Sequence, residues 1–193
     1  MIIHICGPSG SGKTTLGNNL KKKFDNKIIV KDLDDLRDEF IKSYYGEKRW
    51  TFINVREYQK YINDYIKKHN KKPIIFVGLN DNTIFGRDKE LYYNVHSNYN
   101  FYIDIDDNVI IEQKCERFIL EFLPEILKSE KKDITENNEN FIKQVTRVLK
   151  EECSLKKTKK LNKKWAKDYK KMGYIFLSRE NIYKKVFSIL KWN

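Results

Sequence analysis

The sequence predicts an α/β protein, a three-layer α/β/α sandwich around a five-stranded parallel sheet. Short apolar runs alternate with helical patterns along the chain, which is typical of parallel strands joined by helices. A glycine-rich turn follows the first apolar run directly, and acidic or amide residues follow two others. Because right-handed crossovers bring such turns to one edge of a parallel sheet, these residues are expected to lie close together.

Five apolar runs are predicted to be the strands, at residues 1–6, 27–31, 74–77, 101–105 and 173–178. Helical patterns occupy residues 14–21, the segment after Asp32, 51 to about 69, 109 to about 127, 141 to about 153, the C-terminal half of 155–171, and 179–190. The polar segment 128–140 has no core pattern and is predicted to be a mobile excursion at the edge of a helical lid, which covers roughly residues 114–147. Nothing marks a second domain, so residues 1–193 are expected to form one.

Composition favours an anionic partner. The 193 residues carry a formal net charge of +12, and the sequence pI is about 9.4, which suits nucleotides, nucleic acid or acidic surfaces. A second explanation competes, because Lys, Asn, Ile and Tyr are all abundant and A/T-rich codons specify all four. No apolar run approaches the roughly 20 residues that cross a bilayer, so no membrane partner is expected.

The cysteines indicate a reducing compartment. Cys6, Cys115 and Cys153 are odd in number and widely spaced, which is typical of reduced thiols. The first apolar strand lacks the charged segment that precedes the core of a secretory signal, so a cytoplasmic location is expected. Without metal-ligand spacing or a catalytic motif around them, a structural role is favoured for all three cysteines. The sequence indicates no oligomeric state.

The turn after the first strand has the pattern of a phosphate-binding loop. Residues 7–14 read Gly-Pro-Ser-Gly-Ser-Gly-Lys-Thr, matching G-x-x-x-x-G-K-[ST]. Glycines permit the positive φ angles that turn backbone N–H groups toward a phosphate, and the next helix directs its N-terminus at the same anion. The lysine can reach the β- and γ-phosphates of ATP, and the threonine hydroxyl can bind Mg²⁺. The predicted nucleotide-binding residues are Gly7, Ser9, Gly10, Ser11, Gly12, Lys13, Thr14 and Thr15. The alternative is a plain Gly/Ser turn.

Polar residues follow the second and third strands. Asp32 and Asp34 are two residues apart, so on an extended chain both carboxylates could face one site. Helix capping is the alternative, and the preferred division assigns one acid to the cap and the other to a ligand. Gly78, Asn80 and Asp81 follow the third strand, where substrate contacts and Asx-turn formation are equally favoured. The predicted substrate-binding residues are Asp32, Asp34, Arg37, Gly78, Asn80, Asp81 and Arg147.

Two groups of cations lie further along the chain. Lys114 and Arg117 are three residues apart on one face of a predicted helix, and Arg147 is in the next helix. Residues 155–171 combine many lysines with Trp165 and Tyr169. Such a run is usually a solvated face, but a basic stretch interleaved with aromatic residues can also bind single-stranded nucleic acid.

The chain resembles the small-molecule kinases of the P-loop fold, namely nucleoside and nucleoside-monophosphate kinases, with shikimate kinase as a close relative. The loop at 7–14 is typical of the whole superfamily. Asp32-Leu33-Asp34 resembles the D-x-D of shikimate-kinase-like enzymes, which implies that one of the two acids supports Mg²⁺ and that the other approaches the acceptor hydroxyl. The preferred assignment gives Mg²⁺ to Thr14 and Asp32 and the hydroxyl to Asp34. Residues 102–105 and 109–117 are similar to the strand and lid helix of adenylate-kinase-like enzymes, which implies that Lys114 and Arg117 contact the transferring phosphoryl group. Residues 174–190 resemble the last strand and helix, whose connecting loop borders the adenine.

The chain also departs from these families. The third strand ends in Gly78 without the usual D-G or E-G acid, and Gly78-Leu79-Asn80-Asp81 stands where adenylate kinases have G-F-P-R. The triple glycine of shikimate kinase is missing as well. These departures argue against an ordinary adenylate kinase and leave the identity of the Mg²⁺-binding acid open between Asp32 and Asp34.

The leading hypothesis is an ATP- and Mg²⁺-dependent kinase whose acceptor is a nucleoside or nucleotide. Its catalytic residues would be Lys13, Asp34, Lys114 and Arg117. Three alternatives remain: a kinase for polynucleotide 5′-hydroxyl ends, a shikimate-kinase-like kinase for a small metabolite, and a nucleotide-binding switch with little turnover.

Overall fold

The computed structural model describes residues 1–46, 54–79, 95–124 and 138–191. The chain forms two compact units, one made of Met1–Gly7, Gly12–Asp104 and Lys170–Asn193 and the other of Pro8–Ser11 and Ile105–Tyr169. The expectation of one domain over residues 1–193 stays a prediction. Among the described helices, none combines the length and the apolar character that a membrane crossing requires.

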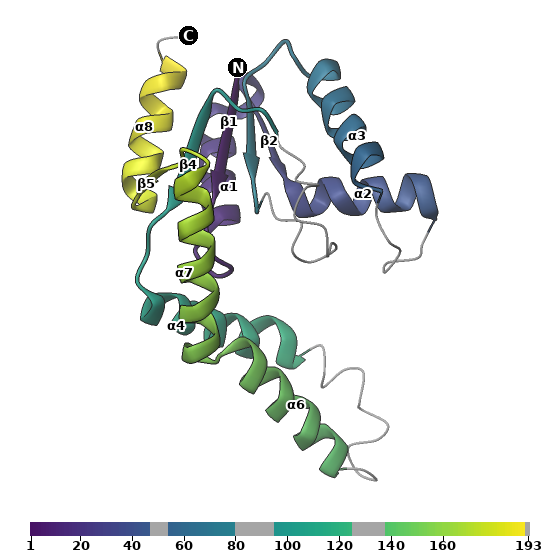
Figure 1. The fold of residues 1–193 in the computed structure, drawn as a ribbon, viewed down its shortest axis with the longest axis vertical. Helices are drawn as coiled ribbons and strands as arrows, with labels where there is room; N and C mark the ends of the chain where they lie inside the picture. The colour runs from purple at the N-terminus through teal and green to yellow at the C-terminus, as the bar shows by residue number, and fades with distance from the viewer. Residues whose placement is uncertain (47–53, 80–94, 125–137, 192–193) are drawn as a thin grey trace. The chain divides into compact units, whose positions relative to one another are not determined.

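The first unit contains a parallel sheet of five strands in the order β2-β3-β1-β4-β5 (Figure 1). The strands are β1 (Ile2–Cys6), β2 (Ile29–Asp32), β3 (Ile74–Val77), β4 (Tyr99–Ile103) and β5 (Ile175–Leu177). In the register of the sheet, Ile5 of β1 lies opposite Val77 of β3 and Phe101 of β4. All four residues of β3 are buried, as expected for a strand covered on both faces. The predicted α/β class and parallel sheet are confirmed, with strand ends within two residues of prediction.

One face of the sheet is covered by α1 (Lys13–Phe24) and α8 (Arg179–Lys191). Gly17 of α1 lies against the side chains of Val30 and Val77, where a Cβ atom would be only 3.0 Å from Val30 Cγ1. Near the end of the helix, the rings of Phe24 and Phe187 join α1 to α8, with 5.4 Å between their centroids. These contacts fix α1, and with it the start of the helix at Lys13, against the sheet.

The other face is covered by α2 (Leu33–Tyr45) and α3 (Val55–Lys68). Phe40 of α2 and Tyr58 of α3 are buried in one cluster with Ile74 and Phe76 of β3. Side chains alternate along a strand, so Ile74 and Phe76 point to the face opposite Ile75 and Val77. Because Val77 contacts Gly17 of α1, the two helix pairs cover opposite faces, and the three-layer sandwich is confirmed.

The second unit is helical, with α4 (Asp107–Arg117), one turn of π-helix called η2 (Phe118–Phe122), α6 (Asn138–Glu152) and α7 (Leu155–Lys171). The Asp106 carboxylate caps α4 by accepting a hydrogen bond from the Asn108 N–H at 2.8 Å, and the helix begins two residues before the predicted position 109. Helix α7 spans its whole segment, so the prediction of a helix only in the C-terminal half was too short. Most of the predicted lid lies in this unit, residues 125–137 lie outside the described residues, and the lid function stays a prediction.

The order of the strands determines where a ligand would bind. From β1 the chain passes to one side of the sheet for β2 and β3, and then to the other side for β4 and β5. In open parallel sheets, ligands bind beyond the carboxyl ends of the strands, where the strand order reverses. In this sheet that position is the end of β1, which the glycine-rich turn follows directly.

Candidate active site

The turn between β1 and α1 has the backbone of an anion-binding loop. Its three glycines all have positive φ angles, 157° at Gly7, 82° at Gly10 and 79° at Gly12. Gly12, in the left-handed region, is the N-cap residue of α1. A glycine contributes no side-chain acceptor to the N–H groups of the first turn, and a bound anion is a common substitute. The Ser11 hydroxyl is completely buried in this turn.

Ser11 tests whether the turn suits a phosphate. Among the described residues, its Oγ atom has no hydrogen-bond partner. A buried hydroxyl without a partner costs about 1–3 kcal/mol, so such a group is usually explained by a ligand or another missing partner. A phosphate oxygen would supply the missing acceptor. The residues of the turn therefore fit the polyphosphate that the motif predicts.

Lys13, the first residue of α1, turns back over the loop. Its Nζ atom donates a hydrogen bond to the Gly7 carbonyl oxygen at 3.0 Å, and the contact is partly buried. The ammonium group therefore lies over the entrance of the turn, at the end of β1. The guanidinium of Arg179, the first residue of α8, packs so closely against Gly12 that a Cβ atom there would overlap it. Two cations thus flank the start of α1.

Thr14 and Asp32 meet at the ends of neighbouring elements. The Thr14 hydroxyl donates a hydrogen bond to Asp32 Oδ2 at 3.2 Å, and Asp32 Oδ1 accepts one from the Asp34 N–H at 2.9 Å. Burial raises the pKa of the Asp32 carboxyl above its usual value, and the nearby Asp34 and Asp35 raise it too, while the two hydrogen bonds lower it. A hydroxyl and a partly buried carboxylate are the oxygen ligands that Mg²⁺ takes alongside water and phosphate. Thr14 and Asp32 therefore fit the predicted Mg²⁺ pair.

Of the two acids, Asp32 is the helix cap, and the extended arrangement expected for the pair is wrong. Helix α2 begins at Leu33, so Asp34 lies in its first turn rather than two residues along an extended chain. Asp32 both caps α2 and contacts Thr14, whereas the exposed Asp34 forms an ion pair with Arg37 Nη1 at 2.9 Å. Arg37 Nε also lies 3.7 Å from Asp38. The catalytic role of Asp34 and the substrate-binding role of Arg37 stay predictions.

Gly78 ends the third strand in a tightly packed position. It is buried with φ 132°, and a Cβ atom would lie 2.9 Å from Leu33 Cβ at the start of α2. The expected close approach of backbone at Gly78 is therefore present. Asn80 and Asp81, the other predicted substrate contacts after this strand, lie outside the described residues.

A buried histidine in β1 contacts the backbone of Gly78. His4 of β1 is completely buried, with its Nε2 atom 3.0 Å from the Gly78 carbonyl oxygen and its Nδ1 atom 2.5 Å from the Tyr174 hydroxyl. If Nε2 donates to the carbonyl, Nδ1 accepts from the hydroxyl, so one neutral tautomer satisfies both contacts. Burial is the main reason that the pKa of His4 is lowered to about 4; the hydrogen bond to Gly78 acts to raise it, and the charge of Lys13 acts to lower it. A lone histidine in an apolar strand was the only sequence signal for this contact.

The predicted lid cations occupy different surroundings. In the second unit, Lys114 of α4 packs on the loop segment, where a Cβ atom at Gly10 would lie 3.1 Å from Lys114 Cγ. Arg117, one turn further, is exposed, and its Nε atom lies 2.7 Å from Glu121 Oε2. Arg147 is exposed on α6. Lys114 is therefore brought to the loop, and the phosphoryl-binding roles of all three cations stay predictions.

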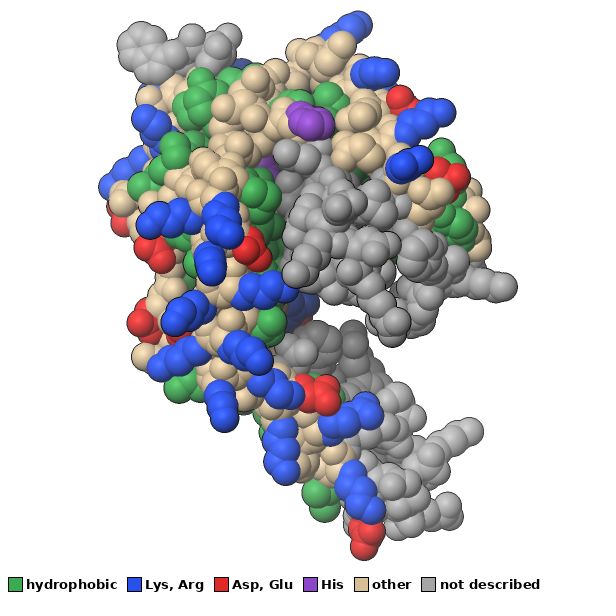
Figure 2. All heavy atoms as spheres, in the orientation of Figure 1, with side chains coloured by type: hydrophobic (Ala, Val, Ile, Leu, Met, Phe, Trp, Pro, Cys, Tyr) green, Lys and Arg blue, Asp and Glu red, His purple; other side chains and the backbone are tan. Residues whose placement is uncertain are grey.

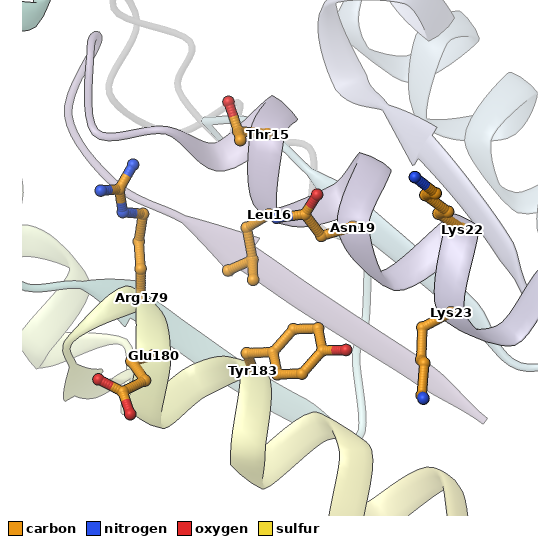
Figure 3. Close-up of a pocket in the computed structure, with 8 residues that line it drawn as sticks. All are labelled: Thr15, Leu16, Asn19, Lys22, Lys23, Arg179, Glu180 and Tyr183. Atoms are coloured by element: carbon orange, nitrogen blue, oxygen red, sulfur yellow. The ribbon is translucent and has the colours of Figure 1, made fainter.

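A pocket of about 760 Å³ opens between α1 and α8 in the first unit. In Figure 3, Leu16 and Tyr183 face one another across it, with Arg179 at one end and Lys22 and Lys23 at the other. Thr15, Asn19 and Glu180 complete the lining. Of these residues only Thr15 was predicted as part of the site. The position of Arg179 directly after the last strand is the signal that could have identified it.

Cys6 is the last residue of β1 and directly precedes the glycine-rich turn. Burial raises the pKa of the Cys6 thiol well above its usual range, so this cysteine is an apolar filler of β1, as predicted. Among the described residues, no three His, Cys, Asp or Glu side chains gather as a metal-binding group. Mg²⁺ bound to a nucleotide needs only one or two protein ligands, because phosphates and water supply the others.

Searches with the sequence find neither a matching family model nor a matching curated protein. Among solved structures, the chain is similar to an uncharacterized protein from Eubacterium ventriosum, with a TM-score of 0.48, 14% identity, and 100% of this chain and 99% of that chain covered. It is similar to thymidylate kinase from Ehrlichia chaffeensis (TM-score 0.37, 17% identity, 68% and 88% covered). It is also similar to shikimate kinase from Acinetobacter baumannii in complex with shikimate (TM-score 0.36, 12% identity, 100% and 93% covered). The fold itself is established by the order and direction of the five strands.

Proposed function

We propose that the protein is an ATP-dependent kinase that transfers the γ-phosphoryl group of ATP to a small acceptor of the nucleoside or nucleotide class. One observation carries the proposal. A turn with the spacing of a phosphate-binding loop follows the central strand, and its buried Ser11 hydroxyl has no partner among the described residues. The resemblance of residues 102–105 and 109–117 to adenylate-kinase-like enzymes supports the choice of acceptor class.

Each residue near the loop would have a role in phosphoryl transfer that follows from its position. The loop N–H groups and Lys13 would hold the β- and γ-phosphate oxygens, since a helix N-terminus and an ammonium group both favour negative charge. Lys114, which packs on Gly10, would contact the phosphoryl group as it moves. Asp34 would orient the acceptor hydroxyl or accept its proton. Positioning and charge stabilisation supply most of the rate enhancement in reactions of this class.

Thr14 and Asp32 would hold Mg²⁺, which neutralises charge on the β- and γ-phosphates when bound. Their mutual contact at 3.2 Å keeps both oxygens at the same place beside the loop. The pocket between α1 and α8 would accept the adenine, because Tyr183 offers an aromatic face and Leu16 an apolar wall. The cation at its loop end, Arg179, would then lie near the phosphates.

A panel of acceptors tests the proposal. The protein would be incubated with ATP and Mg²⁺ together with nucleosides, nucleoside monophosphates, shikimate-like hydroxy acids or oligonucleotides with 5′-hydroxyl ends, and ADP release would be measured for each. We expect release that depends on a nucleoside or nucleotide. Release that no acceptor stimulates would instead favour a nucleotide-dependent switch, and failure to bind ATP at all would overturn the proposal.

A polynucleotide 5′-hydroxyl end is the second candidate acceptor. The specific observation that favours it is the concentration of lysines on α7. Oligonucleotides in the same panel decide between the two acceptor classes, because only a polynucleotide kinase would phosphorylate them better than a mononucleoside.

A further inference from the structure

Helix α7 carries most of the excess positive charge of the chain. It contains nine lysines and one acidic residue, Asp168. The whole chain has 39 Lys and Arg against 27 Asp and Glu, so the 176 residues outside α7 hold 30 basic and 26 acidic side chains and are close to neutral. A codon bias toward lysine would spread lysines along the chain rather than concentrate them in one helix. The charge of α7 therefore needs its own explanation.

The nine lysines share one face of the helix. At 100° per residue they fill a continuous arc of about 160°, and every helix position within that arc is a lysine. All nine are exposed, and Figure 2 shows Lys and Arg side chains gathered over α7. On the opposite side, Thr158 and Tyr169 are buried, and Asn162 Nδ2 donates a hydrogen bond to Asp107 Oδ1 of α4 at 2.5 Å. We call the nine residues the lysine face of α7; they are Lys156, Lys157, Lys159, Lys160, Lys163, Lys164, Lys167, Lys170 and Lys171.

Such an arrangement opposes helix formation. Like charges three or four residues apart cost about 0.2–0.5 kcal/mol per pair, and the lysine face contains many such pairs. Other helices of the protein place an acid at this spacing instead: Glu139 lies 3.4 Å from Lys143 in α6, and Glu180 lies 2.6 Å from Lys184 in α8. Within the described residues, no acid forms an ion pair with the lysine face. The lysine face therefore lacks the ion pairs that accompany the lysines of α6 and α8, and a bound polyanion would offset its repulsion.

The chemistry of the lysine face favours phosphates. Lysines are point charges on flexible stems that contact phosphate oxygens without selecting an orientation, and α7 contains no arginine for bidentate contacts. On the side of α7 away from the lysines, Thr158 and Tyr169 are buried, while Leu155 and Leu161 are exposed. These two leucines lie about 120° apart around the helix, so they do not form a continuous apolar face that could enter a membrane surface. A 17-residue helix is about 25 Å long, so its row of charges suits a linear chain with regularly spaced phosphates.

The structure favours contacts to the polynucleotide backbone over stacking of bases on the aromatic residues of α7. Tyr169 is only 2% exposed, and Trp165 is half-buried on the inner side of the helix. The aromatic residues that interleave with lysines in the sequence therefore do not interleave with them in space, and the hypothesis that bases stack on them is not supported. Contacts would be made to the backbone, which is read without regard to base sequence.

We propose that the lysine face of α7 binds the phosphodiester backbone of a polynucleotide. This binding is separate from phosphoryl transfer and needs neither ATP nor the catalytic lysine. The same compact unit contains loop segment Pro8–Ser11, α4 with Lys114 packed on Gly10, and the Asn162 contact that fixes α7 to α4. A strand bound to α7 would therefore be held by the unit that also carries part of the phosphate loop.

Two variants with equal loss of charge test the proposal. The first replaces four residues of the lysine face with glutamine, Lys156→Gln, Lys160→Gln, Lys163→Gln and Lys167→Gln. The control replaces four exposed lysines in and after α3, Lys67→Gln, Lys68→Gln, Lys71→Gln and Lys72→Gln. Glutamine keeps good helix propensity, and circular dichroism with thermal melting checks that both variants fold. Binding of a fluorescent 20-nucleotide single-stranded DNA is measured by anisotropy without ATP, from 50 to 300 mM NaCl.

We expect the α7 variant to bind at least about tenfold more weakly at 100 mM salt, and its slope of log affinity against log salt to fall by about 3. The control should keep the affinity and slope of the unaltered protein to within about twofold. Equal losses in both variants would overturn the proposal, because the effect would then be one of net charge. Two other results would also overturn the proposal. One is displacement of the DNA by poly-L-glutamate, or by vesicles containing phosphatidylserine, at equal charge; the other is absence of DNA binding at 50 mM salt.

A Lys13→Ala protein separates this proposal from the kinase. It should bind the oligonucleotide as the unaltered protein does, although it should not transfer phosphate. If phosphoryl transfer proved absent from the unaltered protein while α7-dependent DNA binding remained, the proposed function would fail and the nucleic-acid surface would stand. Loss of DNA binding in Lys13→Ala would place the polynucleotide at the phosphate loop instead and overturn the assignment to α7.

Discussion

The glycine-rich loop at residues 7–14 and the lysine face of α7 are both proposed to bind phosphates, but they are built in opposite ways. The loop has few groups, each with a fixed position: Gly12 at φ 79°, Lys13 Nζ 3.0 Å from the Gly7 carbonyl oxygen, and Thr14 Oγ1 3.2 Å from Asp32. The lysine face has nine exposed side chains, none of them in an ion pair with an acid among the described residues. In the loop, phosphate binding would depend on a few groups in fixed positions, whereas on α7 it would be spread over nine similar lysines.

This difference determines how each surface responds to substitution. Partly buried groups in a loop interact at low effective dielectric and cannot substitute for one another, so losing one removes most of the effect. Exposed lysines are screened by solvent and salt, and each contributes little by itself. Single substitutions should therefore be severe at the loop and mild on α7, and the predictions below test that contrast.

The largest effect is expected at Lys13. Replacing it with alanine removes the ammonium group that lies over the turn, and with it the cation proposed for the β- and γ-phosphates. We expect Lys13→Ala to reduce acceptor-dependent ADP release by roughly 10³-fold or more, as for other cations that stabilise a transferring phosphoryl group. Steady-state kinetics with the acceptor identified in the panel measures this loss.

Lys21→Ala is the matched control, because Lys21 lies exposed on the same helix and the charge change is the same. It should keep its activity to within about twofold, as expected for an exposed surface charge. A Lys13→Ala protein with full activity would contradict both the proposed function and the description of the loop as a concentrated site.

His4 tests whether a buried group in β1, the strand that precedes the loop, also has a large effect by itself, here on the pH dependence of stability. Its pKa in the folded protein is about 4 against 6.5 for a free histidine, so the unfolded chain binds the proton more readily. Stability from this group is fully present above pH 6.5 and is lost as the pH falls toward 4. We expect the free energy of unfolding to fall by about 3 kcal/mol over that range through His4 alone.

The control for this prediction is His4→Asn, which keeps a polar side chain but does not titrate. Urea unfolding of both proteins between pH 4 and pH 7.5 gives the two slopes of unfolding free energy against pH. The Asn variant should be less stable at pH 7 and should show the smaller slope. Equal slopes would mean that His4 keeps no lowered pKa beside Tyr174, Gly78 and Lys13.

Substitutions at Asp32 and Asp34 compare a carboxylate held by hydrogen bonds with an exposed one in the same segment. Asp32→Asn preserves the helix cap, since asparagine caps as well as aspartate does, but it removes the charge beside Thr14. We expect it to raise the Mg²⁺ concentration needed for half-maximal rate by about tenfold or more. Asp34→Asn should lower the maximal rate without changing the Mg²⁺ requirement. If only Asp34→Asn changed the Mg²⁺ requirement, the two roles would have to be exchanged.

Much of this framework could be predicted from the sequence because it depends on local pattern. The third strand was predicted with its observed bounds, Ile74–Val77, since a run buried on both faces is apolar at every position. The loop motif specified which residues lie at the turn, because its chemistry requires fixed spacing. The start of α4 was predicted to within two residues, and its cap is equally local, because Asp106 accepts a hydrogen bond from the N–H only two residues away.

What could not be predicted depends on contacts between distant residues. His4 and Tyr174 are 170 positions apart, and no periodicity relates them. Arg179 reaches Gly12 only because α8 returns beside α1. The separation of aromatic residues from lysines in α7 also required the structure, because their order in the chain suggested a mixture that the geometry of the helix resolves into two faces.

The smallest effect is expected from one lysine of α7. Lys163 lies near the middle of the helix, and Lys163→Gln removes one exposed charge from nine. If binding is distributed, the affinity for the 20-nucleotide DNA should fall only about two- to fivefold, and the salt slope by about 0.7. Lys67→Gln on α3 is the single-residue control and should change neither quantity. A loss of a hundredfold or more from Lys163→Gln would show that α7 contains a concentrated site like the loop, and the contrast between the two surfaces would fail.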